Sequence, residues 1–511
     1  MSVMTLPANL DQLTADELRE LVCQQAEVIT RNDRELNWRQ AKIDKLTHEV
    51  AYYKRHYFGV KAERLPVEQG QLFEETLAAD MAAMTEELAQ LSETETKPKG
   101  QAKRKPLPPE LPRTEIHHEP ESTTCACGCQ LQRIGEDVAE KLDYTPGTFT
   151  VERHIRGKWA CAECETLVQA PVPAHVIDKG IPTTGLLAHV LIAKYLDHLP
   201  LYSQEGIFGR AGLPIPQSTL AEWVGQMGVA LQPLVDALKA EMLTYPVLHA
   251  DETPVAMLDP GAGKTHRAYL WSYSIGAFEP VKAVVYDFAD SRAGKHARDF
   301  LGDWRGTLVC DDYAGYKALI ADGVTEAGCM AHARRKFFDL HANNQSQIAQ
   351  QALIYIQRLY QVEREVADLS PGERERIRQE QAKPILDEFH DWLSRHRLQV
   401  PNGSSTAKAI DYSLKRWKAL VHYLDDGQVP IDNNWIENRI RPIATGRKNW
   451  LFAGSLRAGQ RAAAIMSLIQ SAKLNGHDPF AYLKDVLSRL PTQPFSKIAE
   501  LLPHRWQSNP A

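Results

Sequence analysis

The apolar positions of the first sixty residues follow a seven-residue period. One seam of this period consists of Val22, Ile29, Leu36, Ile43, Val50 and Tyr57. The sequence TADE at Thr14–Glu17 is a capping box, which marks a helix start. A seven-residue apolar repeat is most simply buried in a left-handed coiled coil. Residues 1–65 therefore predict a helix that joins copies of the chain into a homodimer or a higher homo-oligomer. The alternative is an amphipathic helix that packs on its own protein.

Residues 66–115 have the composition of a linker. A short helical pattern near Leu72–Leu91 is followed by KPKGQAKRKPLPPELPR. Five cations and no anion lie between Lys97 and Lys105, and several prolines follow. Such a composition favours an extended or disordered chain. The basic run has two interpretations, a solvated tether or a contact to DNA phosphates.

Two cysteine clusters lie in residues 116–175, which predict a zinc-ribbon-like module. The first cluster is TTCACGCQL, the second is WACAEC, and the strand-like sequence GTFTVERHIRGKWA lies between them. Two cysteine knuckles joined by strands form the pattern of a four-thiolate zinc site. A small module with few apolar residues needs a bound metal or another cross-link to stabilise its fold. The preferred ligands of one structural Zn²⁺ are Cys125, Cys127, Cys161 and Cys164. Cys129 is the alternative to Cys125 or Cys127, and free thiols are the remaining interpretation.

Residues 180–240 read as helical. Helices are predicted around Leu186–Tyr195 and Leu201–Ala211, and a third is predicted to start with Ser218 as its N-cap. Helix, glycine turn and capped helix form the outline of a helix-turn-helix. A structural helical hairpin fits the same pattern, so both interpretations stay open.

From residue 246 the pattern changes to strands. The segments PVLHADETPVAML, HRAYLWSYSIG and KAVVYDFADSR read as three strands, and GKHARDFLGDW reads as a helix. The segment GTLVCDDYAGYKAL begins as a buried strand, and TEAGCMAHARRKFF is a short strand that runs into a basic helix. Three strands, helix, strand, helix, strand is the element order of a ribonuclease H-like fold. This core is predicted over 245–470, with a helical insertion at about 340–428 and a C-terminal helical tail over 471–511.

The first and fourth of these strands carry acids. Asp251 lies in the first strand and Asp311 at the end of the fourth, and these strands are neighbours in such a sheet. Carboxylate oxygens gathered at one place suit Mg²⁺ or Mn²⁺. Two such ions about 4 Å apart can serve an in-line displacement at phosphorus. The nearby acids that could replace either aspartate are Glu252, Asp259, Asp287 and Asp312.

A third acid, Glu437, lies in a basic stretch, PIDNNWIENRIRPIATGRKNWLFAGS. Between Asp432 and Arg461 there are two acidic and six basic residues, so Glu437 is a candidate metal ligand beside a polyanion. Arginine suits phosphate because its planar fork offers two donors. The predicted DNA contacts are Arg334, Arg335, Arg439, Arg441, Arg447 and Lys448. Trp435 and Trp450 are interpreted as core residues, with base stacking as the alternative.

Composition excludes some classes of protein. The 511 residues carry a formal net charge of −6, so any nucleic-acid contact has to come from local basic segments. No run approaches the roughly 18 apolar residues of a membrane span. The N-terminus has no signal-peptide pattern. Five of the eight cysteines lie in the two clusters, which fits a metal site in a reducing compartment. We therefore expect a cytoplasmic protein with no membrane partner.

Several motifs together resemble one family. HADETP, CDDYAGY, GCMAHARRKF and DNNWIENRIRPIATGRKNWLFAGS, in this order, are similar to transposases of the insertion sequence 66 family. YFGVKAERL, IGEDVAEKLDYTPG, KYLDHLPLYSQE and DPFAYLKDVLSRL extend the resemblance over nearly the whole chain. The resemblance implies a D, D and E catalytic set at Asp251, Asp311 and Glu437 on a ribonuclease H-like core, with two Mg²⁺ or Mn²⁺ ions.

The chain departs from the family pattern in two places. Asp312 replaces the glycine of the family's Asp-Gly-Tyr motif, so Asp311 keeps the ligand position. The first cysteine knuckle lacks the usual Cys-x-x-Cys spacing. Cys329 and His332, spaced C-x-x-H, resemble a signature that follows the last core strand in related transposases, and we interpret this pair as structural.

The element pattern predicts a multidomain α+β and α/β protein, and the resemblance implies that it acts as a DNA transposase in the bacterial cytoplasm, at the nucleoid. It would cleave strands at element ends and join them to target DNA. Small accessory proteins of the same element are further candidate partners. The alternatives are a catalytically inactive DNA-binding regulator and a ribonuclease H-like nuclease without strand transfer.

Overall fold

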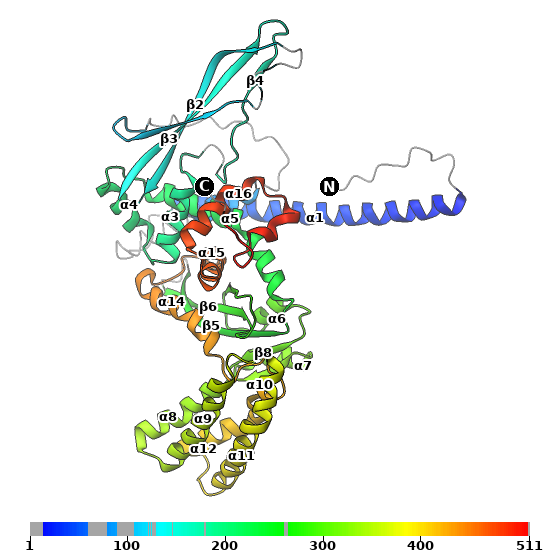
Figure 1. Ribbon diagram of the computed structural model, residues 1–511, viewed down its shortest axis with the longest axis vertical. Coiled ribbons are helices and arrows are strands. Elements are labelled where there is room, and N and C mark those ends of the chain that lie inside the picture. Colours follow the sequence, from blue (N-terminus) through cyan, green and yellow to red (C-terminus); the bar gives the residue numbers. More distant parts are fainter. Residues whose placement is uncertain are drawn as a thin grey trace. The chain divides into compact units, whose positions relative to one another are not determined.

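The computed structural model describes residues 14–59, 79–88, 107–120, 122, 124, 129–145, 147–177, 180–259 and 264–508. It divides into two compact units, Met1–Ala62 with Met81–Arg104, and Glu63–Asp80 with Lys105–Ala511. Helices and sheets both contribute, so the protein is a mixed, multidomain structure (Figure 1). Within the described ranges, no helix combines the length and the apolar character that a membrane crossing requires.

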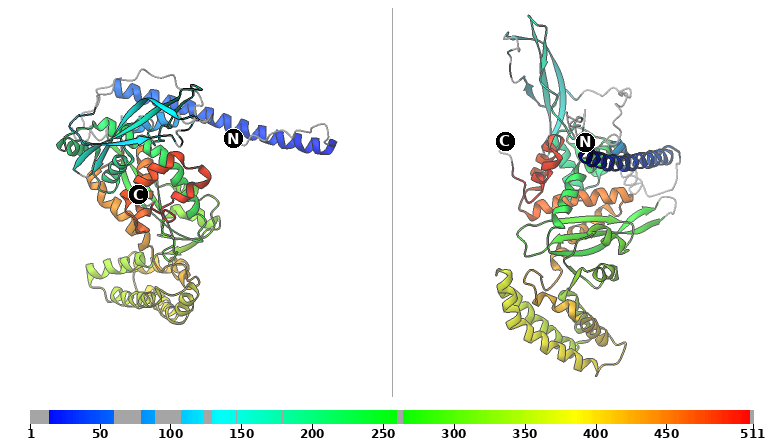
Figure 2. Two further views of the ribbon diagram at one scale, coloured as in Figure 1. Left: turned by 45° about the horizontal axis from the view of Figure 1, so that its top comes forward. Right: turned by 90° about the vertical axis from the view of Figure 1, so that its right-hand side faces the viewer.

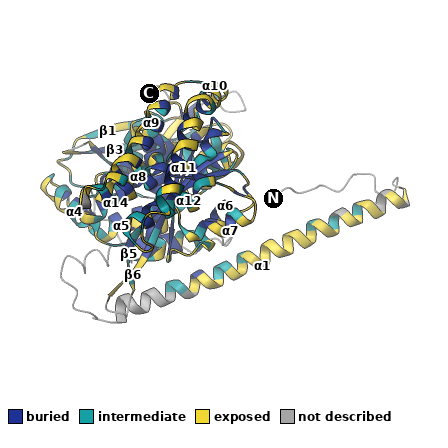
Figure 3. Cartoon of the chain, turned by 90° about the horizontal axis from the view of Figure 1, so that it is seen from below, coloured by how far each residue is buried: buried dark blue, intermediate teal, exposed yellow. Residues whose placement is uncertain are grey.

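The first unit contains the predicted N-terminal helix, α1 (Ala15–Gly59), which is 45 residues long. Its heptad seam is open to solvent, since Val22, Ile29 and Leu36 are 65%, 57% and 59% exposed (Figure 3). Nearer its C-terminal end Leu46 is buried, and Lys42 forms an ion pair with Glu87 at 3.7 Å. Ile43 and Val50 of the seam are partly buried, whereas its first half lies open, so self-association through that half of α1 remains our prediction.

A four-stranded sheet begins the second unit. Its strands are β1 (Arg113–His118), β2 (Leu131–Thr145), β3 (Thr148–Cys161) and β4 (Leu167–Gln169). The strand order is β1-β3-β2, and β4 pairs with the end of β3. Strand β1 starts at Arg113 and so overlaps the last residues of the predicted linker over 66–115. The Arg113 guanidinium donates to the carbonyls of Pro108 and Leu111 and to Glu140, which fixes the chain there.

Three helices follow, α3 (Thr184–Tyr195), α4 (Leu201–Arg210) and α5 (Gln217–Met242). The predicted helices are present, but Ser218 is not the N-cap of the third. The N-cap is Pro216, without a side-chain hydrogen bond, and the Gln217 amide donates instead to the Glu205 carboxylate at 3.2 Å. A contact from α4 thus replaces the local cap that the sequence suggested.

The central sheet has five strands, in the order β7-β6-β5-β8-β9. The strands are β5 (Val247–Asp259), β6 (Lys264–Ile275), β7 (Val284–Ala289), β8 (Thr307–Cys310) and β9 (Thr325–Gly328). The helices α6 (Lys295–Leu301) and α7 (Lys317–Ala321) lie between β7 and β8 and between β8 and β9. The first three strands pair antiparallel, whereas β5-β8 and β8-β9 pair parallel. The elements thus follow the order that the sequence predicted.

A helical insertion follows β9, and its apolar core is continuous with Val247, Val309 and Ala327 of the central sheet. Its helices are α8 (Met330–Asn344), α9 (Gln347–Val366), α10 (Pro371–Ile377), α11 (Lys383–Arg397), α12 (Ser405–Lys415) and α13 (Trp417–Val421). A π-helical segment, Arg378–Ala382, joins α10 to α11. Phe337, Ile356 and Leu386 are among the buried residues of this core. In both views of Figure 2 these helices, yellow-green to gold, gather in one bundle.

The chain returns from the insertion to the central sheet through α14 (Asn434–Trp450), α15 (Leu456–Leu474) and α16 (Pro479–Arg489). Figure 1 shows α14 beside β5 and β6, which it contacts. Helix α15 covers β7, where the hydroxyls of Ser467 and Ser471 accept hydrogen bonds from the Tyr286 and Val284 amides. The central sheet positions Asp251 and Asp311, and the start of α14 positions Glu437.

Candidate active site

The pairing of β5 with β8 positions the two predicted aspartates. The parallel register pairs His249 with Val309, and Asp251 and Asp311 each lie two residues further along. Both acids therefore reach the same level, with Asp251 inside β5 and Asp311 directly after the end of β8. The Asp251 carboxylate accepts a hydrogen bond from the Glu252 amide at 2.8 Å, and the Asp311 carboxylate accepts one from the Tyr313 amide at 3.0 Å.

The pKa of Asp251 responds to the charges of the other two predicted catalytic acids, Asp311 and Glu437. Burial raises the pKa of Asp251 to about 8, and the negative charges of Glu252, Asp311 and Glu437 contribute to the rise, against one hydrogen bond from the Glu252 amide. A buried carboxylate surrounded by carboxylates favours its neutral form. A bound divalent cation would remove this repulsion, so the donor set fits Mg²⁺ or Mn²⁺.

Glu252, the neighbour of Asp251, has other partners. Successive side chains of a strand point to opposite faces, so Glu252 lies across the sheet from Asp251. Its carboxylate accepts hydrogen bonds from Arg292 Nε at 2.8 Å and from the Tyr316 hydroxyl at 2.8 Å. Glu252 is therefore engaged in an ion pair and is a poor substitute for Asp251.

Asp312, the residue that departs from the family motif, also has a partner. Its carboxylate is 2.5 Å from Nη1 of Arg416, which lies between α12 and α13 and is almost fully buried. Arg416 also pairs with Glu326 at 2.8 Å and donates to the carbonyl of Asp311 at 3.4 Å. The insertion thereby holds the loop that carries Asp311.

Asn433 places Glu437 next to β5. It is the N-cap residue of α14, it is 1% exposed, and its Nδ2 donates to the Ala250 carbonyl at 2.9 Å. Its Oδ1 lies 2.7 Å from Nδ1 of His249, a fully buried ring. Burial lowers the pKa of His249 to about 4, so the ring is neutral and can donate this hydrogen bond. Glu437 follows in the first turn of α14.

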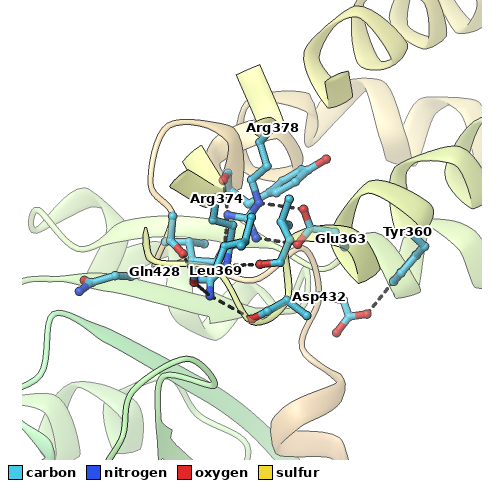
Figure 4. A network of polar contacts seen from close by, with 12 residues as sticks. Tyr360, Glu363, Leu369, Arg374, Arg378, Gln428 and Asp432 are labelled. Atoms are coloured by element: carbon cyan, nitrogen blue, oxygen red, sulfur yellow. Dashed lines mark hydrogen bonds and ion pairs between the residues drawn. The ribbon is translucent and has the colours of Figure 1, made fainter. Parts of the chain in front are cut away.

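The insertion fixes the segment just before Asn433. Tyr360 of α9 donates its hydroxyl hydrogen to Asp432 at 2.7 Å, and the buried Arg378 donates to the carbonyls of Tyr423 and Val429 (Figure 4). Arg378 also pairs with Glu363 at 2.6 Å, which compensates its buried charge. The helical block thus leads the chain back to the sheet in a defined position.

Glu437 has close neighbours from the start of α8. Single ligand atoms of Cys329, His332 and Glu437 all lie within 4.8 Å of one another, the one such potential metal cluster among the described residues. The distance from His332 Nδ1 to Glu437 Oε1 is 3.7 Å, and Arg335 Nη2 lies 3.8 Å from Glu437 Oε2. The C-x-x-H pair, interpreted as structural from the sequence, therefore adjoins the third predicted catalytic acid.

The predicted DNA-binding cations fall into two groups. The exposed cations are Arg334, Arg335, Arg441 and Lys448. The half-buried cations have partners inside the protein: Arg439 lies over the Trp435 ring at 4.0 Å, and Arg447 donates to the Pro254 carbonyl at 2.6 Å. Trp435 itself donates to the Ser274 hydroxyl, which supports its interpretation as a core residue.

The predicted zinc ligands are described only in part. Cys125 and Cys127 lie outside the described residues. Cys161 is buried against Leu131 at the pairing of β2 with β3, and Cys129 packs against the same small cluster. The choice between Cys129 and its two neighbours in the first knuckle therefore remains open.

Sequence reasoning did not find four residues that support the site: Asn433, His249, Arg292 and Arg416. The two adjacent asparagines in DNNWIEN, Asn433 and Asn434, indicate a helix start. They do not indicate that Asn433 forms a hydrogen bond with strand β5. The other three contacts join residues 40 to 184 positions apart, and no local pattern reports them.

Comparison with known proteins finds family matches along most of the chain. Residues 179–461 match the profile described as Transposase IS66 family, and residues 467–504 match the IS66 C-terminal element. Residues 122–165 match the zinc-finger binding domain of transposase IS66, and residues 45–116 match Transposase C of IS166 homeodomain. The chain is 35% identical over 491 residues to the uncharacterized protein y4hP of Sinorhizobium fredii, covering 92% of this chain and 88% of that protein. It is 36% identical over 487 residues to y4jD of the same organism, covering 91% and 95%.

The profile matches define a transposase with DNA-binding domains, and they imply DNA as a partner. The chain belongs to the IS66 family of transposases. The match over 122–165 spans all five clustered cysteines and supports zinc binding by that module.

Proposed function

We propose that the chain is an active DNA transposase whose catalytic set is Asp251, Asp311 and Glu437. The observation that carries the proposal is the common level of Asp251 in β5 and Asp311 directly after β8. Burial and the charge of Glu252 raise the pKa of Asp251 most, and the charges of Asp311 and Glu437 add to the rise, so both acids lie within electrostatic reach of Asp251. The strand order β7-β6-β5-β8-β9 supports a ribonuclease H-like core. In such a core, the acids on the two central strands and on a following helix meet at one edge of the sheet.

The three carboxylates would hold two Mg²⁺ or Mn²⁺ ions. Bound there, these ions would activate the attacking oxygen and stabilise the leaving oxygen at phosphorus. The protein would supply rigidity: β5 and β8 fix Asp251 and Asp311, and Asn433 ties the first turn of α14 to β5. Water would attack the phosphodiester at the element end and release a 3′-hydroxyl. That hydroxyl would attack target DNA, and no covalent link between protein and DNA is required.

The remaining parts would hold the DNA. The exposed cations Arg334, Arg335, Arg441 and Lys448 lie on α8 and α14, the helices that carry His332 and Glu437, and are proposed to contact phosphates. We now assign Arg439 and Arg447 a structural contribution as well, because each has a partner within the protein. The zinc module, with one Zn²⁺, and the α3–α5 helices would bind the element ends, and α1 would join protomers. Small accessory proteins of the element remain candidate partners.

The test uses purified protein and DNA that carries the inverted repeats flanking the gene. Asp251→Asn, Asp311→Asn and Glu437→Gln should each abolish Mg²⁺-dependent joining while end binding in a gel-shift assay stays within about twofold. Asp259→Asn, at the exposed end of β5, is the matched control and should join normally. Normal joining by any of the three variants would refute the assignment. End binding by wild type without cleavage would indicate an inactive regulator, and cleavage without joining would indicate a nuclease.

A further inference from the structure

A second metal-binding arrangement shares one acid with the proposed catalytic set. Cys329 is the N-cap residue of α8, and His332 follows in the first turn of that helix. A spacing of three residues places both side chains on one side of the helix. The first turn of α14 brings Glu437 to the same place, so that ligand atoms of the three residues lie within 4.8 Å of one another.

Two polar atoms of this cluster have no hydrogen-bond partner among the described residues. His332 Nδ1 and Glu437 Oε1 are both buried and have no hydrogen-bond partner, although they lie 3.7 Å from each other. The Cys329 sulfur is fully buried and accepts a hydrogen bond from the Asn433 amide at 3.2 Å. Buried polar atoms without partners are costly, and a cation between these atoms would satisfy them.

The donor types select the kind of cation. One thiolate, one imidazole and one carboxylate suit Zn²⁺ and related thiophilic ions, whereas Mg²⁺ prefers oxygen ligands. In a tetrahedral zinc site the ligand atoms lie roughly 3.3–3.8 Å apart. The 3.7 Å between His332 Nδ1 and Glu437 Oε1 lies within this range, and the Cys329 sulfur lies within 4.8 Å of a ligand atom of each. A fourth position would be left for water or a DNA oxygen.

We propose that Cys329, His332 and Glu437 form a binding site for a thiophilic divalent cation such as Zn²⁺. Binding forms a metal–sulfur bond and releases the Cys329 proton to solvent. A consequence, which rests on the proposed function, is that an occupied site holds Glu437 away from Asp251 and Asp311. Zn²⁺ would therefore inhibit Mg²⁺-dependent DNA joining by occupying a shared ligand.

The binding test uses the full-length protein as purified and Co²⁺ as the probe. Wild type should bind one more equivalent of Co²⁺ than His332→Gln or Cys329→Ser, with a thiolate-to-cobalt absorption band in the difference spectrum. That difference isolates the site, because the cysteines within residues 122–165 are unchanged in every variant. The matched controls are His341→Gln, on the same helix, and Cys23→Ser, an exposed thiol, and both should bind like wild type. Equal binding by wild type and His332→Gln would overturn the proposal and leave a simple ion pair between His332 and Glu437.

The inhibition test separates this proposal from the proposed function. The Zn²⁺ concentration that halves joining should rise at least tenfold in His332→Gln relative to wild type and to His341→Gln. Lost Co²⁺ binding without a change in Zn²⁺ sensitivity would overturn the inhibitory consequence, while the metal site would stand. If Asp251→Asn fails to join DNA, the catalytic assignment is supported. If wild type also binds no more Co²⁺ than His332→Gln, the metal site is overturned while the catalytic assignment stands.

Discussion

Replacing Asn433 by alanine tests whether one buried amide couples α14 to the sheet. The change removes the hydrogen bond from Nδ2 to the Ala250 carbonyl and the one between Oδ1 and His249. Both partners are fully buried, so each is left without its hydrogen bond. An unsatisfied buried group costs about 1–3 kcal/mol. After partial relaxation of the surrounding structure, we expect the free energy of opening the first turn of α14 to fall by about 3 kcal/mol. The equilibrium constant for opening then rises roughly a hundredfold.

Hydrogen exchange of the amides at the start of α14 measures this opening directly, without requiring the whole chain to unfold in one step. DNA joining should fall by about 10- to 100-fold, because a misplacement of about 1 Å in a reacting group has effects of that size. Asn434→Ala is the matched control, since that neighbour is exposed. Faster exchange in Asn433→Ala with undiminished joining would refute the claim that this amide positions Glu437.

Three further predictions concern charges around the site. Without added Mg²⁺, the folded-state pKa of Asp251, about 8, lies above the ordinary value of 3.8, so wild type loses stability as pH rises between about 4 and 8. The free energy of unfolding of Asp251→Asn should therefore rise relative to that of wild type over this pH range, by a few kcal/mol at most. A difference in thermal stability between the two proteins that does not change with pH would contradict this. Arg416→Ala should lower joining about tenfold by releasing the Asp311 loop, and an unchanged rate would contradict that role. Arg441→Ala and Lys448→Ala should weaken DNA binding and flatten its salt dependence in titrations, whereas Arg447→Ala should mainly lower the melting temperature.

The sequence pattern predicts those helices and strands whose apolar periodicity is contained within the segment itself. The heptad period predicts α1, and the alternation of apolar and acidic segments predicts the strands and helices of the central sheet in their order. The placement of Asp251 and Asp311 on adjacent strands followed from that order, because the fold class fixes which strands are neighbours. Glu437 was found as a lone acid among cations, and its helix starts next to the predicted Asp432–Asn434 segment.

Contacts between distant segments were not predictable from one sequence. Ser218 has the residue type of an N-cap, yet Glu205 of another helix satisfies the start of α5. The basic run around Arg447 predicts a phosphate contact, but it gives no sign of the hydrogen bond that this side chain donates to the backbone of β5. The bond between His249 and Asn433 spans 184 positions. These outcomes depend on tertiary packing, which overrides local preference wherever two elements meet.

Metal-directed cleavage of the polypeptide tests most directly whether the three acids surround one metal site. Fe²⁺ bound in place of Mg²⁺, with ascorbate and peroxide, generates radicals that cut the backbone near the ion, and the cut sites are read by mass spectrometry. The account predicts cuts close to Asp251, Asp311 and Glu437 in wild type, which Mg²⁺ suppresses and Asp251→Asn removes together. Cuts near Glu437 without cuts near the two aspartates would contradict a shared catalytic metal site.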